Sequence, residues 1–523
     1  VQLGTVGTAA ALLVLALSAA APALMAAAFL GGLSWIAVLT SFNVSAQMAL
    51  PDWVRARGLA VFLMGFFGSM ALGSVIWGQV ATATSVPTAL LLAATGLILG
   101  LVSTRRFTVG QGERLDLSAA SIWPQAPALD LAASPDRTAM VTVEYRVAEA
   151  DRDGFLDLYV GNYVDYSFEN PKPCRSSTSA RDYCSPLVYE PQVDSLFRNR
   201  GDGTFEDVSV ASGIRGAFGG ALGVVAADFN GDRWPDIYVA NDGVANQLWI
   251  NDGKGRFVND AVMAGVAVNM DGSPEASMGV DAGDFDADGD EDLFMTHLAR
   301  ETNTLYINDG KGWFEDRTVA MGLANPSFAF TGFGTAWMDY DRDGWLDLLV
   351  VNGAVTRIEE QLMAGDPYPL KQLNQLFRNL GDGRYTEVSG QAGSSFEASH
   401  VSRGAAFGDI DQDGAPDVVI ANNAGPARVL LNIMDNGHDW IGLRLVTSDG
   451  RRDAYGARVA LEADRPLWRR VRADGSYASS NDPRVLFGLG KEGPARRSAR
   501  VVWPDGAEER FTNLSTGRYH LLR

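Results

Sequence analysis

The sequence predicts a mixed fold: about four transmembrane α-helices, followed by an all-β, partial β-propeller and a small all-β C-terminal module. Three observations predict it. Residues 1–104 hold only three charged side chains, an acidic loop occurs five times before an apolar strand, and residues 435–523 are rich in arginine. At 523 residues the chain is longer than one ordinary domain, so we expect two or three.

The N-terminal stretch has the composition of membrane-spanning helices. Residues 1–51 contain no charged residue, and residues 58–80 and 86–103 are also uncharged and apolar. A bilayer-spanning helix needs roughly 20 apolar residues. A signal peptide has one apolar core behind a basic leader, so we exclude it, and a soluble helical bundle would need polar faces. We therefore expect four spans, at residues 3–19, 23–49, 58–80 and 86–103.

Four arginines orient this segment. Arg55 and Arg57 lie between the second and third expected spans, and Arg105 and Arg106 follow the fourth. Lys and Arg in short loops mark the cytoplasmic side of a membrane. We therefore expect a multi-pass protein of the bacterial inner membrane, with everything after residue 104 on the cytoplasmic side.

Three segments of this region resemble a known family. They are SFNVSAQMALPDWVRARGLAVF (41–62), RRFTVGQGERLDLSAASIWP (105–124) and MVTVEYRV (140–147). They resemble the last third of a major facilitator superfamily exporter, of the enterobactin-exporter-like, transmembrane secretion effector subgroup. The resemblance covers about residues 1–148 and implies helices in two halves around a transport pathway. It assigns residues 1–106 to part of the transmembrane helices and residues 107–148 to an exporter tail or linker.

The nine-residue acidic loop has the pattern of a cation site. The copies are EADRDGFLD (149–157), DFNGDRWPD (228–236), DFDADGDED (284–292), DYDRDGWLD (339–347) and DIDQDGAPD (409–417). Oxygen ligands at positions 1, 3, 5 and 9 converge on one point, and Gly at position 6 permits a sharp turn, which suits a hard cation such as Ca²⁺. Carboxylates this close would repel one another without an ion. The sequence therefore predicts up to five bound Ca²⁺ ions.

The candidate ligands are the side chains at positions 1, 3, 5 and 9 of the five loops. They are Glu149, Asp151, Asp153, Asp157, Asp228, Asn230, Asp232, Asp236, Asp284, Asp286, Asp288, Asp292, Asp339, Asp341, Asp343, Asp347, Asp409, Asp411, Asp413 and Asp417.

The two alternatives to this interpretation of the loops are an EF-hand and a solvated acidic turn. An EF-hand shares positions 1, 3, 5 and 6 but requires Glu at position 12 and flanking helices. Position 12 is apolar in every copy and lies in a β-type run: Val160, Val239, Met295, Val350 and Ile420. A solvated acidic turn would explain one copy, but five copies in fixed phase with a strand argue against it.

A second phrase follows four of the loops. It reads SLFRNRGDGTF (195–205), QLWINDGKGRF (247–257), TLYINDGKGWF (304–314) and QLFRNLGDGRY (375–385), and each copy predicts a strand, a Gly-containing hairpin turn and a strand. The loops begin 79, 56, 55 and 70 residues apart, with insertions near 161–193 and 354–373. A turn-rich β unit at this period indicates a propeller or a related array.

These repeats resemble the FG-GAP/VCBS repeat proteins, whose blades carry the D-x-D-x-D-G-x-x-D loop on a β-propeller. NYVDY (162–166), RDYCSP (181–186) and SMG (277–279) are similar to the cartilage acidic protein branch. Two positions depart from the pattern: Arg233 replaces the loop glycine, and Glu149 is a longer acid at position 1. The resemblance places the propeller at 149–434. It also implies more blades than the five loops found, so we expect a ring that lacks its first blades and has an exposed strand edge.

Cys174 and Cys184 are the only cysteines, and they lie ten residues apart in the first insertion. Their spacing allows a small disulfide-bonded loop, which we favour over two free thiols and which would indicate an oxidising compartment. Zinc is not expected, since no further Cys or nearby His completes a site.

Residues 435–523 differ in charge from the repeats, with sixteen Lys and Arg against twelve acids. Apolar alternation as in WIGLRLV (440–446) predicts a small all-β domain. Its phrases DAYGAR (453–458), GSYAS (475–479), FGLG (487–490) and WPDG (503–506) resemble the ASPIC/UnbV module. We expect its arginines to form a solvated face.

The function predicted is binding or adhesion rather than catalysis, with a protein or glycan as the unknown partner of the propeller. The four histidines, His297, His400, His438 and His520, are scattered, and none stands in a nucleophile–base pattern. No enzyme activity and no catalytic residue is therefore expected. A net charge of −20 makes nucleic acid a poor partner, while about residues 3–103 would contact the lipid bilayer. The alternative is a membrane efflux transporter of the major facilitator type with an incidental soluble tail.

The two halves of the chain imply different locations. The arginines place the propeller in the cytoplasm, whereas calcium loops and a disulfide favour the outside of the cell. The junction is abrupt, because residues 149–153 fit either family. We interpret the chain as a join between two truncated genes, made by recombination or by an assembly error.

Overall fold

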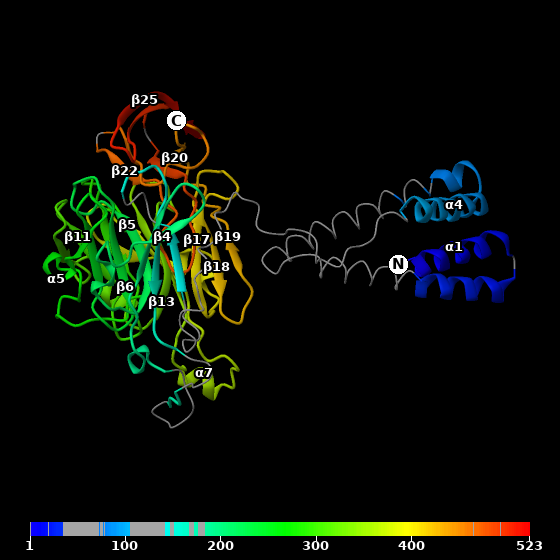
Figure 1. The fold of residues 1–523 in the computed structure, drawn as a ribbon, viewed down its shortest axis with the longest axis horizontal. Coiled ribbons are helices and arrows are strands. Elements are labelled where there is room, and N and C mark those ends of the chain that lie inside the picture. Colours follow the sequence, from blue (N-terminus) through cyan, green and yellow to red (C-terminus); the bar gives the residue numbers. More distant parts are fainter. Residues whose placement is uncertain are drawn as a thin grey trace. The chain divides into compact units, whose positions relative to one another are not determined.

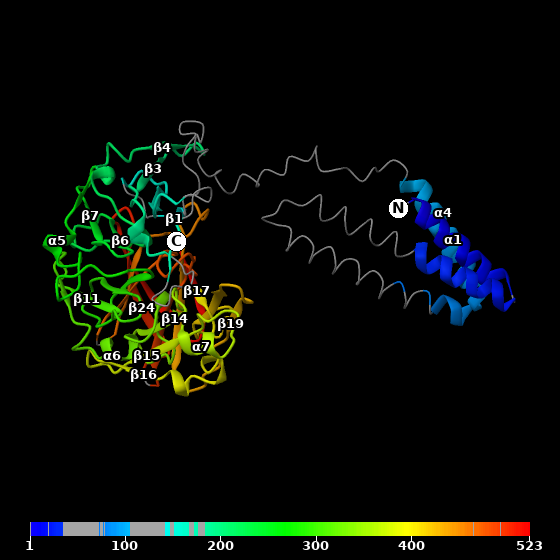
Figure 2. The ribbon, with the colours of Figure 1, turned by 90° about the horizontal axis from the view of Figure 1, so that it is seen from below.

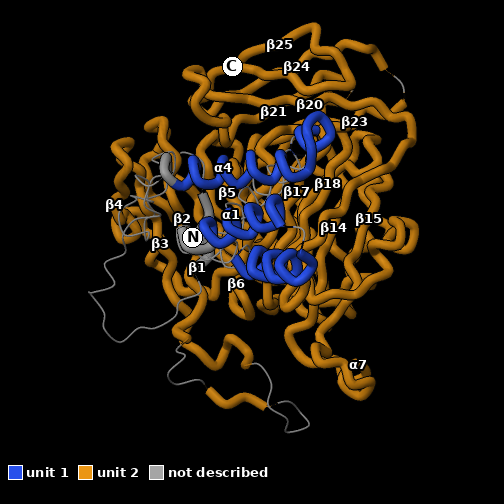
Figure 3. Tube along the Cα trace, turned by 90° about the vertical axis from the view of Figure 1, so that its right-hand side faces the viewer, with its two compact units in different colours: residues 1–125 blue, residues 126–523 orange. Residues whose placement is uncertain are grey.

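The computed structural model in Figure 1 describes residues 2–18, 20–34, 73, 77, 79–104, 142–146, 151–166, 172–175, 184–463, 465–491 and 493–523. The chain divides into two compact units, Val1–Gln125 and Ala126–Arg523, which Figure 3 colours separately.

The first unit contains the helices α1 (Gln2–Leu17) and α4 (Val86–Thr104), which pack against each other. Over the described residues, no helix combines the length and the apolar character needed to cross a membrane. The predicted fold class, with four transmembrane helices, is therefore wrong. α1 has 16 residues and α4 has 19, against the roughly 20 apolar residues of a membrane span.

The bounds of α1 and α4 agree with the expected spans 3–19 and 86–103 to within two residues. The physical reason for the error is that a lack of charge predicts an apolar environment, and this alone does not make a helix able to cross a bilayer. The expected spans 23–49 and 58–80 fall largely outside the described residues.

The second unit begins with five antiparallel sheets that follow one another around a common axis (Figure 2). Each sheet pairs its strands in chain order, and the first strands of neighbouring sheets lie together. We call these first strands the inner strands. This is a propeller-type array.

The first sheet holds β1 (Thr142–Arg146), β2 (Leu158–Asn162), β3 (Ser195–Asn199) and β4 (Phe205–Asp207), and the second holds β5 (Ala221–Ala227), β6 (Asp236–Asn241), β7 (Gln247–Asn251) and β8 (Phe257–Asn259). The third sheet holds β9 (Val280–Gly283), β10 (Asp292–Met295), β11 (Thr304–Asn308) and β12 (Phe314–Asp316). The fourth holds β13 (Gly332–Met338), β14 (Asp347–Asn352), β15 (Gln375–Asn379) and β16 (Tyr385–Glu387). The first sheet thus begins within the exporter-like tail, because β1 pairs with β2.

The apolar run after each acidic loop becomes the second strand of a sheet. β6 and β14 are buried along their whole length, as expected of a short continuous apolar run enclosed on both faces. The repeated phrase with its glycine turn forms the third and fourth strands, for example β15 and β16. The antiparallel order puts the acidic loops and these hairpins at one end of the array, and both insertions at the other.

The fifth sheet has only three strands, β17 (Ser402–Gly408), β18 (Asp417–Asn422) and β19 (Arg428–Leu430). Its outer face is open: Val419 is 37% exposed and Val429 is 57% exposed, whereas the equivalent Leu349 and Leu376 of the fourth sheet are 2% and 4% exposed. This open face belongs to the last sheet of the array; the expected strand edge, left where the ring lacks its first blades, stays a prediction.

The C-terminal module consists of two sheets, ordered β23-β20-β26 and β22-β21-β24-β25. Its strands are β20 (Asp439–Leu445), β21 (Arg458–Leu461), β22 (Leu467–Arg470), β23 (Val485–Gly490), β24 (Arg496–Val502), β25 (Glu508–Ser515) and β26 (Tyr519–Leu522). The two sheets enclose a core of its own, with Ile441, Val459 and Phe487 fully buried. The module lies at the end of the array that carries the acidic loops (Figure 1).

The connections at the opposite end hold short helices. η2 (Pro186–Val188) lies in the first insertion, where Cys174 and Cys184 are joined by a disulfide. α7 (Glu359–Met363) lies in the second insertion, and α5 (Ala261–Ala264) and α6 (Ala324–Ser327) lead from one sheet into the next.

Because one face of the fifth sheet is open, the same Val→Ala substitution should lower the free energy of unfolding by different amounts at residues 418 and 419. Val418 is 2% exposed and Val419 is 37% exposed on the same strand. Val418→Ala should lower the free energy of unfolding by about 2 kcal/mol, and Val419→Ala by less than about 1 kcal/mol, because little apolar area is lost there. Chemical denaturation of the two variants measures the difference. Equal costs would mean that this face is covered in solution.

Candidate metal centres

The five acidic loops share one backbone conformation, in which positions 4 and 6 both have a positive φ. Position 4 is Arg152, Gly231, Ala287, Arg342 or Gln412, and position 6 is Gly154, Arg233, Gly289, Gly344 or Gly414. The second loop therefore makes the same turn as the others, but Arg233 takes there, at a φ of 75°, the left-handed conformation that glycine takes elsewhere.

Three of the five loops bring their carboxylates together. In the third, fourth and fifth loops, one oxygen each from positions 1, 3 and 9 lies within 4.8 Å of the other two. The residues are Asp284, Asp286 and Asp292; Asp339, Asp341 and Asp347; and Asp409, Asp411 and Asp417. The position 5 side chains are not in these clusters. Asp288, Asp343 and Asp413 each accept a hydrogen bond from the backbone N–H two residues later, at 3.2, 2.9 and 2.8 Å.

The first two loops differ from these three. Glu149 lies outside the described residues. Asp151 and Asp153 face Arg198, with nitrogen-to-oxygen distances of 2.7 and 3.5 Å. In the second loop Asn230 donates its amide hydrogen to Asp232 at 3.0 Å. Among the described residues, neither loop groups three acids around one point.

The aspartate at position 9 ties each loop to the neighbouring third strand. In the fourth loop, Asp347 accepts from the backbone N–H of Tyr340 at 3.2 Å and from that of Asn379 at 2.8 Å. Asp236, Asp292 and Asp417 make the same pair of bonds, and Asp157 accepts from Asn199. Position 9 is therefore a structural tie as well as a candidate ligand.

The asparagine at the end of the third strand is a residue that sequence reasoning missed. In three sheets its amide donates to the position 2 carbonyl of the preceding sheet's acidic loop. The pairs are Asn308 to Phe229 at 2.8 Å, Asn379 to Phe285 at 3.2 Å and Asn432 to Tyr340 at 2.7 Å. A signal was present, since this asparagine occupies the same place in every copy of the repeated phrase. Adjacent loops are thus linked to one another.

Several carboxylate oxygens in these loops are buried without a hydrogen-bond partner. Both oxygens of Asp284 and Oδ1 of Asp339 are of this kind, and the two residues are 5% and 7% exposed. Burial raises the pKa of Asp284 and of Asp339 to about 7, and neighbouring aspartates add to this against the opposite effect of Arg469. Such groups need either a proton or a cation. A donor set made only of oxygens fits a hard cation.

An arginine on the third strand of the sheet pairs with acids of the first and fourth loops but is absent beside the third loop. Arg378 lies 2.8 Å from Asp341 and 3.1 Å from Asp343, as Arg198 does in the first loop. The equivalent residue beside the third loop is Ile307, and that loop holds six acids in nine residues. The third loop thus lacks this arginine, and an ion pair that reaches it is that of Arg470 with Glu291 at 3.5 Å.

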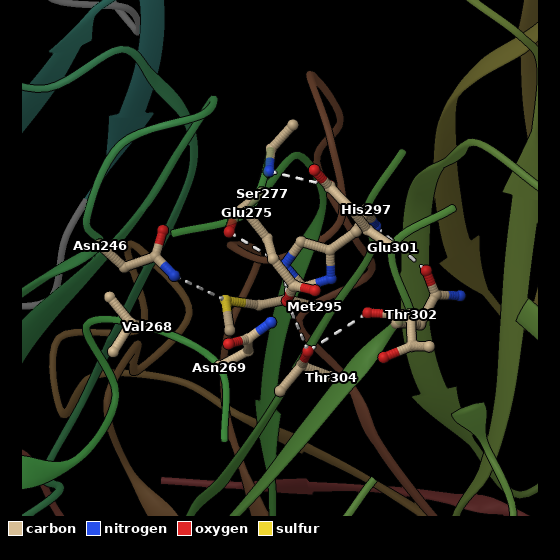
Figure 4. A network of polar contacts seen from close by, with 12 residues as sticks. Asn246, Val268, Asn269, Glu275, Ser277, Met295, His297, Glu301, Thr302 and Thr304 are labelled. Atoms are coloured by element: carbon tan, nitrogen blue, oxygen red, sulfur yellow. Dashed lines mark hydrogen bonds and ion pairs between the residues drawn. The ribbon is translucent and has the colours of Figure 1, made fainter. Parts of the chain in front are cut away.

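A buried polar network surrounds His297 after the third sheet's second strand (Figure 4). Ser277 Oγ lies 3.0 Å and Glu275 Oε2 lies 3.7 Å from the same nitrogen, Nε2 of His297. A catalytic triad places serine and acid at opposite ring nitrogens. Ser277 is fully buried, and burial lowers the pKa of His297 to about 4, which leaves the ring neutral at pH 7. The network has the geometry of a packed polar core.

Comparison with protein families confirms the composite resemblance. Residues 1–161 match the family described as transmembrane secretion effector. Residues 150–239, 228–295 and 284–350 match the FG-GAP-like repeat, and residues 447–523 match ASPIC and UnbV. The first two families overlap at residues 150–161. The second unit is thus a repeat protein of the propeller type.

Curated relatives match part of the chain. Human cartilage acidic protein 1 is 27% identical over 376 residues, which are 69% of this chain and 50% of the relative. The Xenopus tropicalis protein of that name is 32% identical over 165 residues, 30% of this chain and 25% of the relative. The chain spans about half the length of the human relative.

Solved structures show weaker likeness. A lectin of Agrocybe aegerita, described as recognising non-reducing terminal N-acetylglucosamine, is 16% identical, covers 56% of this chain and 81% of its own, and has a TM-score of 0.29. At that score the likeness carries no inference about this chain.

The raised pKa values predict how the stability of the cation-free chain depends on pH. Burial raises the pKa of Asp284 and Asp339 to about 7 and that of Asp236 to about 8, against about 4 when unfolded. Between about pH 4 and pH 8 the folded chain therefore binds more protons than the unfolded chain, and its free energy of unfolding falls as the pH rises. Thermal denaturation of chelator-treated protein should give a lower Tm at pH 8 than at pH 5.5. A Tm that rises over this range would contradict the assignment.

The left-handed conformation of Arg233 predicts a stabilising substitution. A side chain in this conformation costs about 1–2 kcal/mol relative to glycine, part of which glycine returns by making the unfolded chain more flexible. The exposed ion pair of Arg233 with Glu508, at 3.1 Å, contributes little. Arg233→Gly should therefore raise the free energy of unfolding by about 0.5–1 kcal/mol. Arg233→Ala is the control, because it loses the ion pair but keeps a side chain in the left-handed backbone conformation. This variant should not raise the free energy of unfolding. An equal rise in both variants would show that backbone strain at residue 233 is not the cause.

Proposed function

We propose that the chain is a calcium-stabilised, propeller-type protein that binds a protein or glycan partner and does not act by catalysis. The observation that carries the proposal is the group of buried, unpartnered carboxylate oxygens at Asp284 and Asp339, within clusters of three acids. Ca²⁺ would supply the positive charge that these oxygens lack. The residues that would hold it are those of the third, fourth and fifth loops.

The donor chemistry favours calcium over other common ions. Zinc prefers nitrogen and sulfur ligands, and the clusters offer carboxylates. Magnesium requires a small octahedral shell and keeps much of its water, whereas calcium accepts several carboxylates in irregular geometry. Calcium and the Cys174–Cys184 bridge together support an extracytoplasmic location for residues 149–523.

The partner would bind at the end of the array opposite the acidic loops. That end holds the insertions, and large apolar side chains are exposed there: Leu187 is 64% exposed, Met363 79% and Tyr368 53%. Exposed apolar groups on long connections are typical of interaction surfaces. The other end is occupied by the C-terminal module.

Calcium titration of the full chain tests the proposal. After chelation, adding Ca²⁺ should raise the Tm, because a ligand that binds only the folded state stabilises it by about 2.7 kcal/mol for each site at a hundredfold excess over its Kd. Calorimetry should show binding, and Mg²⁺ at equal concentration should bind more weakly.

Two triple variants make the titration specific. Asp286→Asn, Asp341→Asn and Asp411→Asn together remove one ligand charge from each cluster and should weaken binding strongly. Asp252→Asn, Asp309→Asn and Asp382→Asn together remove the same charge from the hairpin turns, where each side chain accepts a backbone N–H, and should leave binding unchanged. No change of Tm with Ca²⁺ in the unchanged chain would remove the proposal.

A further inference from the structure

The C-terminal module inserts one of its connections among the inner strands of the propeller-type array. Residues 471–484, between β22 and β23, form what we call the axial segment. Ser476 exchanges backbone hydrogen bonds with Val280 of β9, at 2.8 and 3.2 Å, and its hydroxyl donates to the carbonyl of Ala405 in β17 at 2.6 Å. Asp474 accepts from the N–H of Ala226 in β5 at 2.8 Å. One short segment therefore contacts the inner strands of three different sheets.

A buried ion pair fixes the axial segment to the array. The guanidinium of Arg472 binds both carboxylate oxygens of Asp281, which is fully buried in β9; the Nη2–Oδ2 distance is 2.7 Å. The same Asp281 accepts from the backbone N–H of Trp337 in β13 at 2.8 Å. Removing the arginine would leave a buried charge without its partner, which is strongly destabilising.

The module also holds carboxylates of two candidate cation sites. The N–H of Gly488 donates to Oδ2 of Asp339 at 3.1 Å, and the hydroxyl of Tyr519 donates to Oδ2 of Asp409 at 2.7 Å. These aspartates stand at position 1 of the fourth and fifth loops. Oδ1 of Asp339 has no partner, so fixing one oxygen leaves the other to face a cation.

We propose that the C-terminal module is a cation-dependent clamp: docking of residues 435–523 on the array and cation binding at the fourth and fifth loops stabilise each other. The inference rests on the proposed calcium binding and assigns a role to the module. Tyr519 and Gly488 act as positioning groups for Asp409 and Asp339. By reciprocity, a cation that prefers the held carboxylates must favour docking by the same factor.

The positive charge of the module opposes this coupling, because the module and a bound cation would repel each other. The module is basic, and Arg469 lowers the pKa of Asp284 and of Asp339 against the larger effect of burial, so a cation would weaken that attraction. Arg469 is the largest influence that lowers the pKa of Asp339, so the opposing effect acts on the fourth loop. At the fifth loop, Tyr519 donates directly to Asp409, and over the described residues no ion pair joins an arginine of the module to that carboxylate. A hydrogen bond to an ionised group is worth about 1.5–3 kcal/mol, so the expected coupling at the fifth loop is positive.

Tyr519→Phe in the full chain tests the clamp. The ring is retained, so its contact with Trp440, at 5.3 Å between ring centroids, is kept, and only the hydroxyl on Asp409 is lost. We expect about a fivefold to tenfold weaker Ca²⁺ affinity at one site, measured by calorimetry. Tyr306→Phe is the matched control, because its hydroxyl donates to the carbonyl of Val268 at 2.8 Å, away from the loops and the module. It should lower stability without changing affinity.

Protease protection provides the reciprocal measurement. Arg472 and Arg484 lie in the axial segment, so trypsin should reach them more readily when that segment leaves the array. Ca²⁺ should therefore slow cleavage there several-fold in the unchanged chain and less in Tyr519→Phe. Equal affinities of the two tyrosine variants, or tighter binding by Tyr519→Phe, would overturn the clamp while leaving calcium binding intact. No Ca²⁺ binding by the unchanged chain would instead remove the proposed function, and the clamp with it.

Discussion

Acidic side chains that are both buried and close together are the constraint on which this fold depends. They can be neither solvated nor mutually neutralised. The chain offsets part of the cost with backbone N–H groups, as at Asp347, and with Arg378 beside the fourth loop. The same groups hold the array together, since Asn379 binds Asp347 through its backbone and reaches the preceding loop through its amide. The candidate cation ligands and the packing of adjacent sheets therefore depend on the same loops.

The repeated part of the fold is readable from the sequence, because its information is local. An acidic turn, an apolar run and a glycine hairpin each specify their own conformation, and their order specifies an antiparallel meander. The clusters are less readable. Whether three acids converge on one point depends on neighbours such as Arg198, which forms ion pairs with Asp151 and Asp153 in the first loop. In the first unit the bounds of α1 and α4 were readable to within two residues, but the conclusion that these helices cross a membrane was not.

The contacts of the C-terminal module with the array left no signal in the sequence pattern. The phrases GSYAS and FGLG were recognised only by resemblance, yet the first lies in the axial segment and the second supplies the N–H of Gly488. Arg472 and Asp281 are 191 residues apart. β1 is a similar case: residues 142–146 alternate like any strand, so exporter-like sequence serves as an inner strand beside β2. The two family matches overlap after β1, at residues 150–161, which hold the first acidic loop and most of β2.

The axial segment follows every sheet of the array in the sequence, and this order has a consequence for biosynthesis. A ribosome releases residues 471–484 only after every sheet of the array has emerged, so the N–H of Ala226 and the carboxylate of Asp281 wait for partners throughout translation. A premature stop codon shortly before residue 471 would leave all five sheets of the array encoded and still deprive the inner strands of these contacts. Such an allele should behave as a loss of the whole domain, cleared by quality control, rather than as a protein with a shortened tail.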